Sequence, residues 1–229
     1  TLSGHLAVQA QLAGAGPVAL IDTDPQGSLA KWWNCREAPQ PAFIHSAFNN
    51  LVHDLDQARD QGFKLVVIDT PPAVTKAISE VVAFADLVVL PTRPSPHDLR
   101  AVGPTIDIVE ARKKQMVFAL NCAAARAKIT SEAAVALSQH GTVAPAIVHS
   151  RTDFAASMID GRTVMEADPD GKSADEIRAL WTYLSGRLAR LDGADERDPA
   201  LSQLIQQAPK NVNALGREAP VFGRRAAYS

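Results

Sequence analysis

Two carboxylates with a single residue between them end an apolar run near the start of the chain. Residues 18–28 read VALIDTDPQGS. The uninterrupted apolar run is typical of a strand that is buried on both faces of a parallel sheet. Asp22 and Asp24 then stand at the carboxyl end of this strand, which is the edge at which open α/β sheets bind ligands. These acids can serve a ligand there, or they can be solvated side chains at an ordinary strand end.

A second run repeats this design. Residues 64–72 read KLVVIDTPP, an apolar strand that ends in Asp69, a threonine and two prolines. The run has the form of a Walker B strand, whose aspartate holds Mg²⁺ beside the phosphates of a nucleotide, usually through a water molecule. Because two strands deliver carboxylates to one edge, the sequence predicts a site for phosphate and metal.

The two motifs together carry a family resemblance. IDTDPQGS at 21–28 followed by VVIDTPP at 66–72 resembles the ParA/MinD family of deviant P-loop ATPases, and DPQG points to its ParA branch. The resemblance implies ATP and Mg²⁺ as cofactors. It also implies that Asp24 orients or activates the attacking water, that Asp69 holds a water of the Mg²⁺ shell, and that Asn121 recognises the edge of the adenine.

Two further residues belong to the expected ATP site. Asp22 is near enough to support the metal, and it can equally be structural. Laying Leu6 and Ala7 on the Leu-Ala landmark of the family makes Thr1 the last threonine of the phosphate loop, whose hydroxyl and amide meet a phosphate. The rest of that loop and the strand before it are absent from this sequence. We therefore expect an ATPase domain truncated within its Walker A motif, and no ATPase activity from the chain as written.

Alternating strand and helix patterns predict the fold class. They indicate a doubly wound α/β domain of the P-loop type, with a mostly parallel sheet, helices on both faces, and its N-terminal strand and phosphate loop missing. The expected strands lie at 18–21, 64–68, 86–91, 116–121 and 143–148. The ATPase domain is expected to span residues 1–191, and residues 192–229 read as a loosely ordered tail.

The composition excludes some classes of protein. The formal net charge of −2 argues against a generally basic nucleic-acid binder, although a local basic face remains open. Cys35 and Cys122 show no metal-ligand spacing and read as reduced cysteines. There is no signal-peptide pattern and no apolar run of membrane-spanning length. A cytoplasmic location is the expectation.

The resemblance also implies partners. Family members close as ATP-dependent homodimers, and the ParA branch binds DNA without sequence preference and responds to a ParB-like or cargo adaptor protein that stimulates hydrolysis. The candidates for a DNA-binding face are Arg151, Arg162, Lys172 and Arg178. Each can also be an ordinary surface charge, and acidic residues lie among them. The expected location is then the nucleoid, with no membrane partner.

Two other functions remain open alongside a partition ATPase that segregates a plasmid, a chromosome or other cargo. A MinD-like positioning ATPase would use a terminal amphipathic helix on the membrane, and residues 221–229 show none. A metabolic ATP-dependent ligase on the same fold would need a substrate pocket or a glutamine-hydrolysing domain, and the chain has no room for the latter.

Overall fold

The computed structural model describes residues 2–72 and 76–195 of the chain. The strands of this part are β1 (Val18–Asp22), β2 (Ala42–Ile44), β3 (Leu65–Asp69), β4 (Leu87–Thr92), β5 (Gln115–Leu120) and β6 (Thr142–Val143). The helices are α1 (Leu2–Leu12), α2 (Ser28–Asn34), the 3₁₀ turn η1 (Phe48–Asn50), α3 (Leu51–Asp60), α4 (Lys76–Phe84), α5 (Pro96–Ala101), α6 (Gly103–Ala111), α7 (Lys128–Ser138), α8 (Thr152–Ser157), α9 (Val164–Ala167) and α10 (Lys172–Asp195).

The strands pair in two parallel sheets. One has the order β2-β1-β3 and the other the order β4-β5-β6. In the first sheet Val18 pairs with Leu65, and the register runs on until Asp22 pairs with Asp69. The carboxyl ends of β1 and β3 therefore lie side by side, as the two sequence motifs predict.

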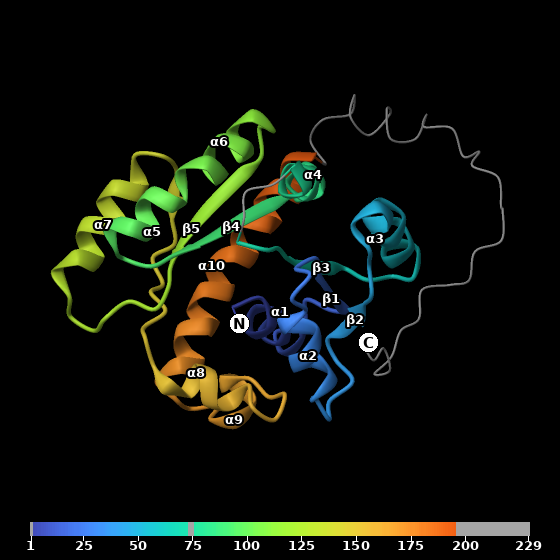
Figure 1. The fold of residues 1–229 in the computed structure, drawn as a ribbon. Helices are drawn as coiled ribbons and strands as arrows, with labels where there is room; N and C mark the ends of the chain where they lie inside the picture. Colours follow the sequence, from blue (N-terminus) through green and yellow to red (C-terminus); the bar gives the residue numbers. More distant parts are fainter. Residues whose placement is uncertain (1, 73–75, 196–229) are drawn as a thin grey trace.

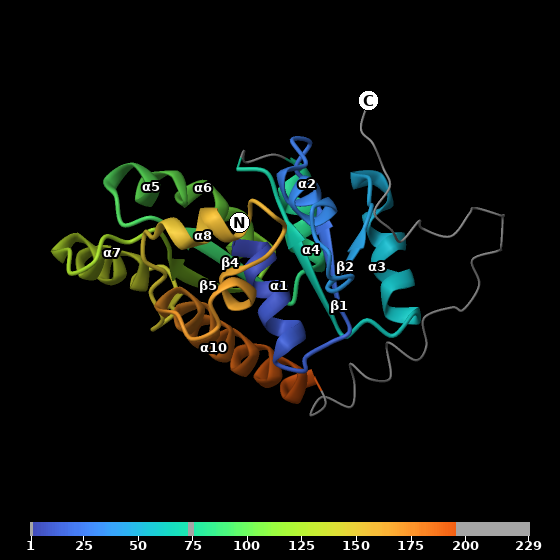
Figure 2. The same cartoon turned by 90° about the horizontal axis from the view of Figure 1, so that it is seen from below.

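Helices cover both faces of these sheets (Figures 1 and 2). On one face the largest core cluster joins α1 and α10 to β1 and β5, through residues such as Leu20, Val117 and Ile177. On the other face α3 packs against β1 and β2, while α6 and α7 pack against β4 and β5. The prediction of a parallel α/β architecture with helices on both faces is confirmed.

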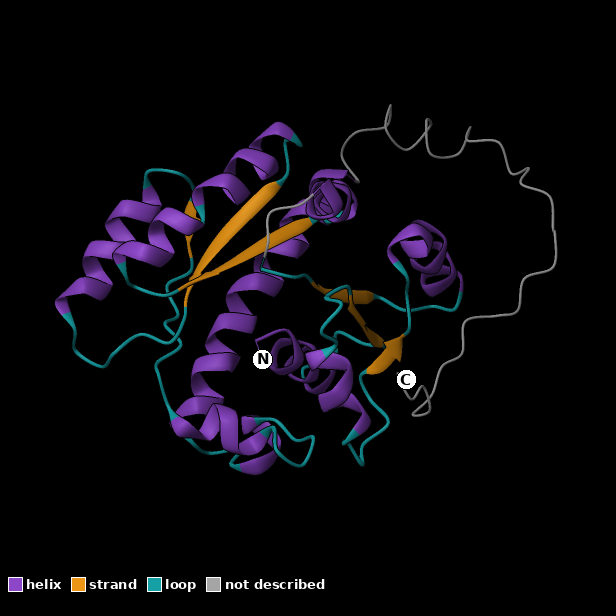
Figure 3. Cartoon of the chain, viewed as in Figure 1, coloured by secondary structure: helices purple, strands orange, loops and turns teal. Residues whose placement is uncertain are grey.

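The single sheet expected from the sequence is divided between β3 and β4 (Figure 3). Each of these strands is at the edge of its own sheet. Val67 of β3 and Val89 of β4 nevertheless pack against the same core, under α1 and α10. Val66 and Val88 point to the opposite side, where α3, α4 and α6 lie. The two sheets thus present matching faces, and the described residues supply no strand between them.

Local sequence signals explain several element ends. Ser95 caps α5, because its hydroxyl oxygen accepts the amide proton of Asp98 at 3.2 Å. The helix that starts there ends before Gly103-Pro104, and α6 begins anew with that proline in its first turn. Pro145 limits β6 to two residues at a sheet edge, since a proline cannot donate to the ladder.

The start of the expected tail is helical, because α10 runs on to Asp195. The rest of that tail, residues 196–229, lies outside the described residues, as does Thr1. In the part of the chain that the structure describes, no helix has the length and apolar character needed to span a bilayer.

Candidate functional site

Asp22, Asp24 and Asp69 come together where β1 and β3 end. Asp22 and Asp69 are partners in the sheet register, and Asp24 follows two residues beyond Asp22. The N-terminus of α1 reaches the same place, where the hydroxyl of Ser3 donates a hydrogen bond of 2.5 Å to Oδ1 of Asp69. The sheet edge that carries the three carboxylates therefore lies next to the N-terminus of α1. The unsatisfied N–H groups of a helix N-terminus favour negatively charged ligands such as phosphate.

Asp69 is held by contacts to both its side chain and its backbone. Its carbonyl oxygen accepts from the amide and the hydroxyl of Thr23, at 2.9 Å and 2.7 Å. Burial raises the pKa of the Asp69 carboxyl, and the nearby charges of Asp22 and Asp24 raise it further, while the hydrogen bond from Ser3 opposes this. Like charges gathered at one place favour a cation or a proton between them.

Asp22 organises the backbone of the turn that follows β1. Its Oδ1 accepts the amide proton of Asp24 at 3.0 Å, and its Oδ2 accepts those of Leu29 and Ala30, each at 3.1 Å. Both carboxylate oxygens are thus engaged by the turn and by the first turn of α2. Of the two roles left open by the sequence, these contacts supply a structural one.

Asp24 lies in a tight turn and is half-buried. Its Oδ1 accepts from the amide of Gln26 at 2.9 Å, and its carbonyl oxygen accepts from the amide of Gly27, also at 2.9 Å. Gly27 has a φ of 60°, a left-handed conformation that glycine adopts without strain. The turn that holds Asp24 thus stands at the same strand ends as Asp69.

The described residues contain no group of three or more His, Cys, Asp or Glu side chains that could hold a metal ion. Mg²⁺ is commonly bound without such a cage, by one or two carboxylates together with substrate phosphates and water. Asp69 fits that mode. Its carboxylate is oriented by the hydrogen bond from Ser3, and the neighbouring Asp22 and Asp24 make its negative charge unfavourable unless a cation compensates it.

Asn121 stands at the carboxyl end of β5, in the second sheet. Its backbone amide donates to the carbonyl oxygen of Thr92 at 3.0 Å, and its side-chain Oδ1 accepts from the amide of Cys122 at 2.9 Å. The side-chain NH₂ group is thereby oriented as a donor. Asn121 thus follows a strand of one sheet, while the strands that end at Asp22 and Asp69 belong to the other.

The arginines predicted to bind DNA are all paired with acids. Arg151 bonds to Glu176 at 2.7 Å, Arg162 to Asp160 at 2.8 Å, and Arg178 to Asp175 at 2.7 Å. Lys172, the fourth candidate, is exposed at the start of α10. All four lie in one region of the chain, around α8 and α9 and the N-terminal part of α10 (Figure 1). Their positive charge is partly neutralised locally, which limits the field that this region offers to a polyanion.

Glu176 ties that region to the segment between β6 and α8. It accepts from the side chain of Arg151 and from both the backbone amide and Nδ1 of His149. Burial alone would raise the pKa of Glu176, but the hydrogen bonds from Arg151 and His149 outweigh it and leave the pKa lowered.

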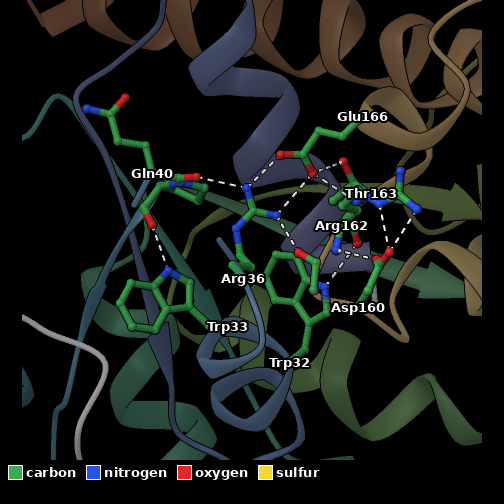
Figure 4. A network of polar contacts seen from close by, with 10 residues as sticks. Trp32, Trp33, Arg36, Gln40, Asp160, Arg162, Thr163 and Glu166 are labelled. Atoms are coloured by element: carbon green, nitrogen blue, oxygen red, sulfur yellow. Dashed lines mark hydrogen bonds and ion pairs between the residues drawn. The ribbon is translucent and has the colours of Figure 1, made fainter. Parts of the chain in front are cut away.

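Sequence reasoning missed two contacts, one within the site and one beyond the C-terminal end of α2. Ser3 was not singled out, although a polar residue in the first turn of a helix that faces a strand end is a usable signal. The second is the ion pair between Arg36 and Glu166, at 2.7 Å with Arg36 only 2% exposed (Figure 4). Its partners are far apart in the sequence, so nothing local could have revealed it.

Comparisons with known proteins extend this description. The chain is 30% identical over 184 residues to "Maintenance of carboxysome distribution protein A" of Halothiobacillus neapolitanus, covering 76% of this chain and 85% of that protein. No family model matches the chain.

Solved structures share its fold. An McdA–ATP complex from Cyanothece superposes with a TM-score of 0.65 at 15% identity, covering 80% of this chain and 91% of that one. A chain of the MinC:MinD cell division protein complex of Aquifex aeolicus gives a TM-score of 0.65 at 13% identity, covering 81% of this chain and 89% of that one.

Proposed function

Because the chain belongs to the ParA/MinD family of P-loop ATPases, we propose that it binds and hydrolyses ATP, closes as an ATP-dependent homodimer and positions a cellular cargo. The observation that carries the proposal is the contact between Ser3 of α1 and Asp69 of β3. It brings a helix N-terminus suited to phosphate to the edge where Asp22 and Asp24 also lie.

The residues at this edge divide the work of phosphoryl transfer. Asp24 would orient the attacking water, and Asp69 would hold the Mg²⁺ ion through a water. Mg²⁺, when bound, would neutralise charge on the phosphates. Asp22 contributes by fixing the turn that carries Asp24, through its three backbone contacts. Asn121 recognises the adenine with its side-chain NH₂ group, because its Oδ1 is already taken by Cys122.

A phosphate loop leading into α1 would complete this site. The matching faces of β3 and β4 support the proposal, since one more parallel strand between them would join the two sheets. Such a strand would end at the same edge as β1 and β3, next to the N-terminus of α1. The family resemblance makes Thr1 the candidate for the last residue of that loop.

The cargo, and the matrix on which the protein would position it, are also proposals. The name of the Halothiobacillus relative makes a carboxysome or a comparable particle the first cargo to test, ahead of a plasmid or chromosome. Nonspecific DNA of the nucleoid is the proposed matrix, bound through Arg151, Arg162, Lys172 and Arg178 in the cytoplasm. A ParB-like or cargo adaptor protein would stimulate hydrolysis. Since three of the four cations are already ion-paired, DNA binding by one protomer is expected to be weak.

Two substitutions test the division of labour, in a chain that carries a strand and a Gly-Lys-Thr loop in front of α1. Asp24→Ala should keep ATP binding and dimerisation but lose turnover, because the water is no longer oriented. Asp69→Ala should instead weaken the binding of Mg·ATP. Phosphate release and nucleotide affinity are measured for both. Hydrolysis by Asp24→Ala at the parent rate would show that the assignment is wrong.

A further inference from the structure

The turn between α8 and α9 is fastened to the C-terminal end of α2 (Figure 4). Arg36, two residues beyond α2, is almost fully buried. Its guanidinium group donates to the carbonyl oxygens of Gly161 at 2.7 Å and Gln40 at 2.9 Å, and to both carboxylate oxygens of Glu166, at 2.7 Å and 3.0 Å. One planar fork thus holds the carbonyl groups of Gln40 and Gly161 and the carboxylate of Glu166 in a fixed arrangement.

Further contacts tighten this junction. The indole N–H of Trp32, on α2, donates to the carbonyl oxygen of Arg162 at 3.1 Å, and the guanidinium carbon of Arg36 lies 5.0 Å from the centre of the Trp32 ring. Glu166 also accepts from the amide and hydroxyl of Thr163, both at 2.8 Å. At Gly161 a Cβ atom would lie 2.5 Å from the backbone nitrogen of Arg36, so the two backbones touch.

The other end of α2 is fixed by Asp22. This carboxylate holds the amide of Asp24 and the amides of Leu29 and Ala30 in the first turn of the helix. Since α2 has only seven residues, its two ends move together as one short rigid body. The turn that carries Asp24 lies between this body and β1. Any tilt of α2 must therefore displace the turn.

We propose that Trp32, Arg36 and Glu166 form a clamp, here called the α2 clamp, that positions the Asp24 turn. These three are positioning residues, because they lie at the far end of α2 and act on Asp24 only through it. The functional consequence, correct placement of the water-orienting carboxylate, rests on the proposed role of Asp24 in ATP hydrolysis. The mechanical claim concerns the turn itself and does not depend on nucleotide.

Amide hydrogen exchange on the chain as it stands tests the mechanical claim. In Arg36→Lys a single ammonium group cannot reach Gly161, Gln40 and both oxygens of Glu166 at once. The amides of Asp24 and Leu29 should then exchange about tenfold faster or more, while amides of β5 change much less. The matched control is Arg59→Lys, which makes the same change at an exposed ion pair on α3 and should leave all these amides unaltered.

The pattern of exchange decides the outcome. Faster exchange confined to residues 161–167 would overturn the proposal, because the clamp would then hold only the α8–α9 turn. Equal acceleration in β5 and in the Asp24 turn would also overturn it, since that is a loss of global stability. If Arg36→Lys does not fold, Glu166→Gln is measured in the same way. Hydrolysis of ATP by Asp24→Ala at the parent rate would contradict only the proposed function and not the clamp, so the two claims fail separately.

Discussion

Replacing Gly161 by alanine should destabilise the protein far more than the same change at Gly14. Both glycines have left-handed backbones, with φ values of 80° and 79°, so each alanine costs about 1–2 kcal/mol of backbone strain. Only at Gly161 does the added methyl meet other atoms, at 2.5 Å from the nitrogen of Arg36 and from the carbonyl carbon of Cys35. At Gly14 nothing lies within 4 Å.

The contact at Gly161 involves backbone, which cannot rotate away, so a shift of the α8–α9 turn adds about 1–3 kcal/mol. We expect a total of about 2–5 kcal/mol for Gly161→Ala, against about 1–2 kcal/mol for Gly14→Ala. The free energy of unfolding is measured by urea denaturation, followed by circular dichroism. Equal losses for the two variants would refute the close approach between this turn and the end of α2.

Three other changes have defined outcomes. Asp69→Asn should raise Tm at pH 7, because burial raises the pKa of Asp69 and so disfavours its charged form in the folded protein. This gain in Tm should disappear as the pH falls below the ordinary pKa range of an aspartate. Burial alone would raise the pKa of Glu166, but hydrogen bonds from Arg36 and Thr163 outweigh it and leave the pKa lowered. The stability that the charged Glu166 contributes should therefore be lost as the pH falls through the lowered pKa. Glu166→Gln should remove this part of the pH dependence of Tm. In a chain that carries the phosphate loop, and with ATP present, changing Arg151 and Arg162 together to Glu should abolish the retention of nonspecific duplex DNA in a gel shift. ATP-dependent dimerisation should persist. DNA binding that is the same with and without nucleotide would contradict this prediction.

The strand ends could be predicted because their signals are local. Apolar runs that stop at Asp22 and Asp69 specify buried parallel strands, and the edge at which ligands bind follows from the parallel topology. The break between α5 and α6 coincides with Gly103-Pro104, which is also a local signal. The division of the sheet was not predicted, because strand order depends on pairing between distant segments.

The roles of individual side chains were harder to predict from the sequence. The sequence left Asp22 open between a metal role and a structural one, and only its three backbone contacts supply the latter. The sequence presented the arginines proposed for DNA as single charges, while the structure pairs them with acids two to 25 residues away. The pair of buried Arg36 and half-buried Glu166 joins residues 130 positions apart, which no periodicity can reveal.

The binding of Mg·ATP, measured by titration calorimetry, tests the central claim most directly. The comparison uses the chain as written, the chain extended in front of α1 by a strand and a Gly-Lys-Thr loop, and the extended chain with Asp69→Ala. We predict Mg²⁺-dependent binding by the extended chain, little or none by the chain as written, and weaker binding after Asp69→Ala. Equal ATP affinity in all three would contradict a nucleotide site at the edge of β1 and β3.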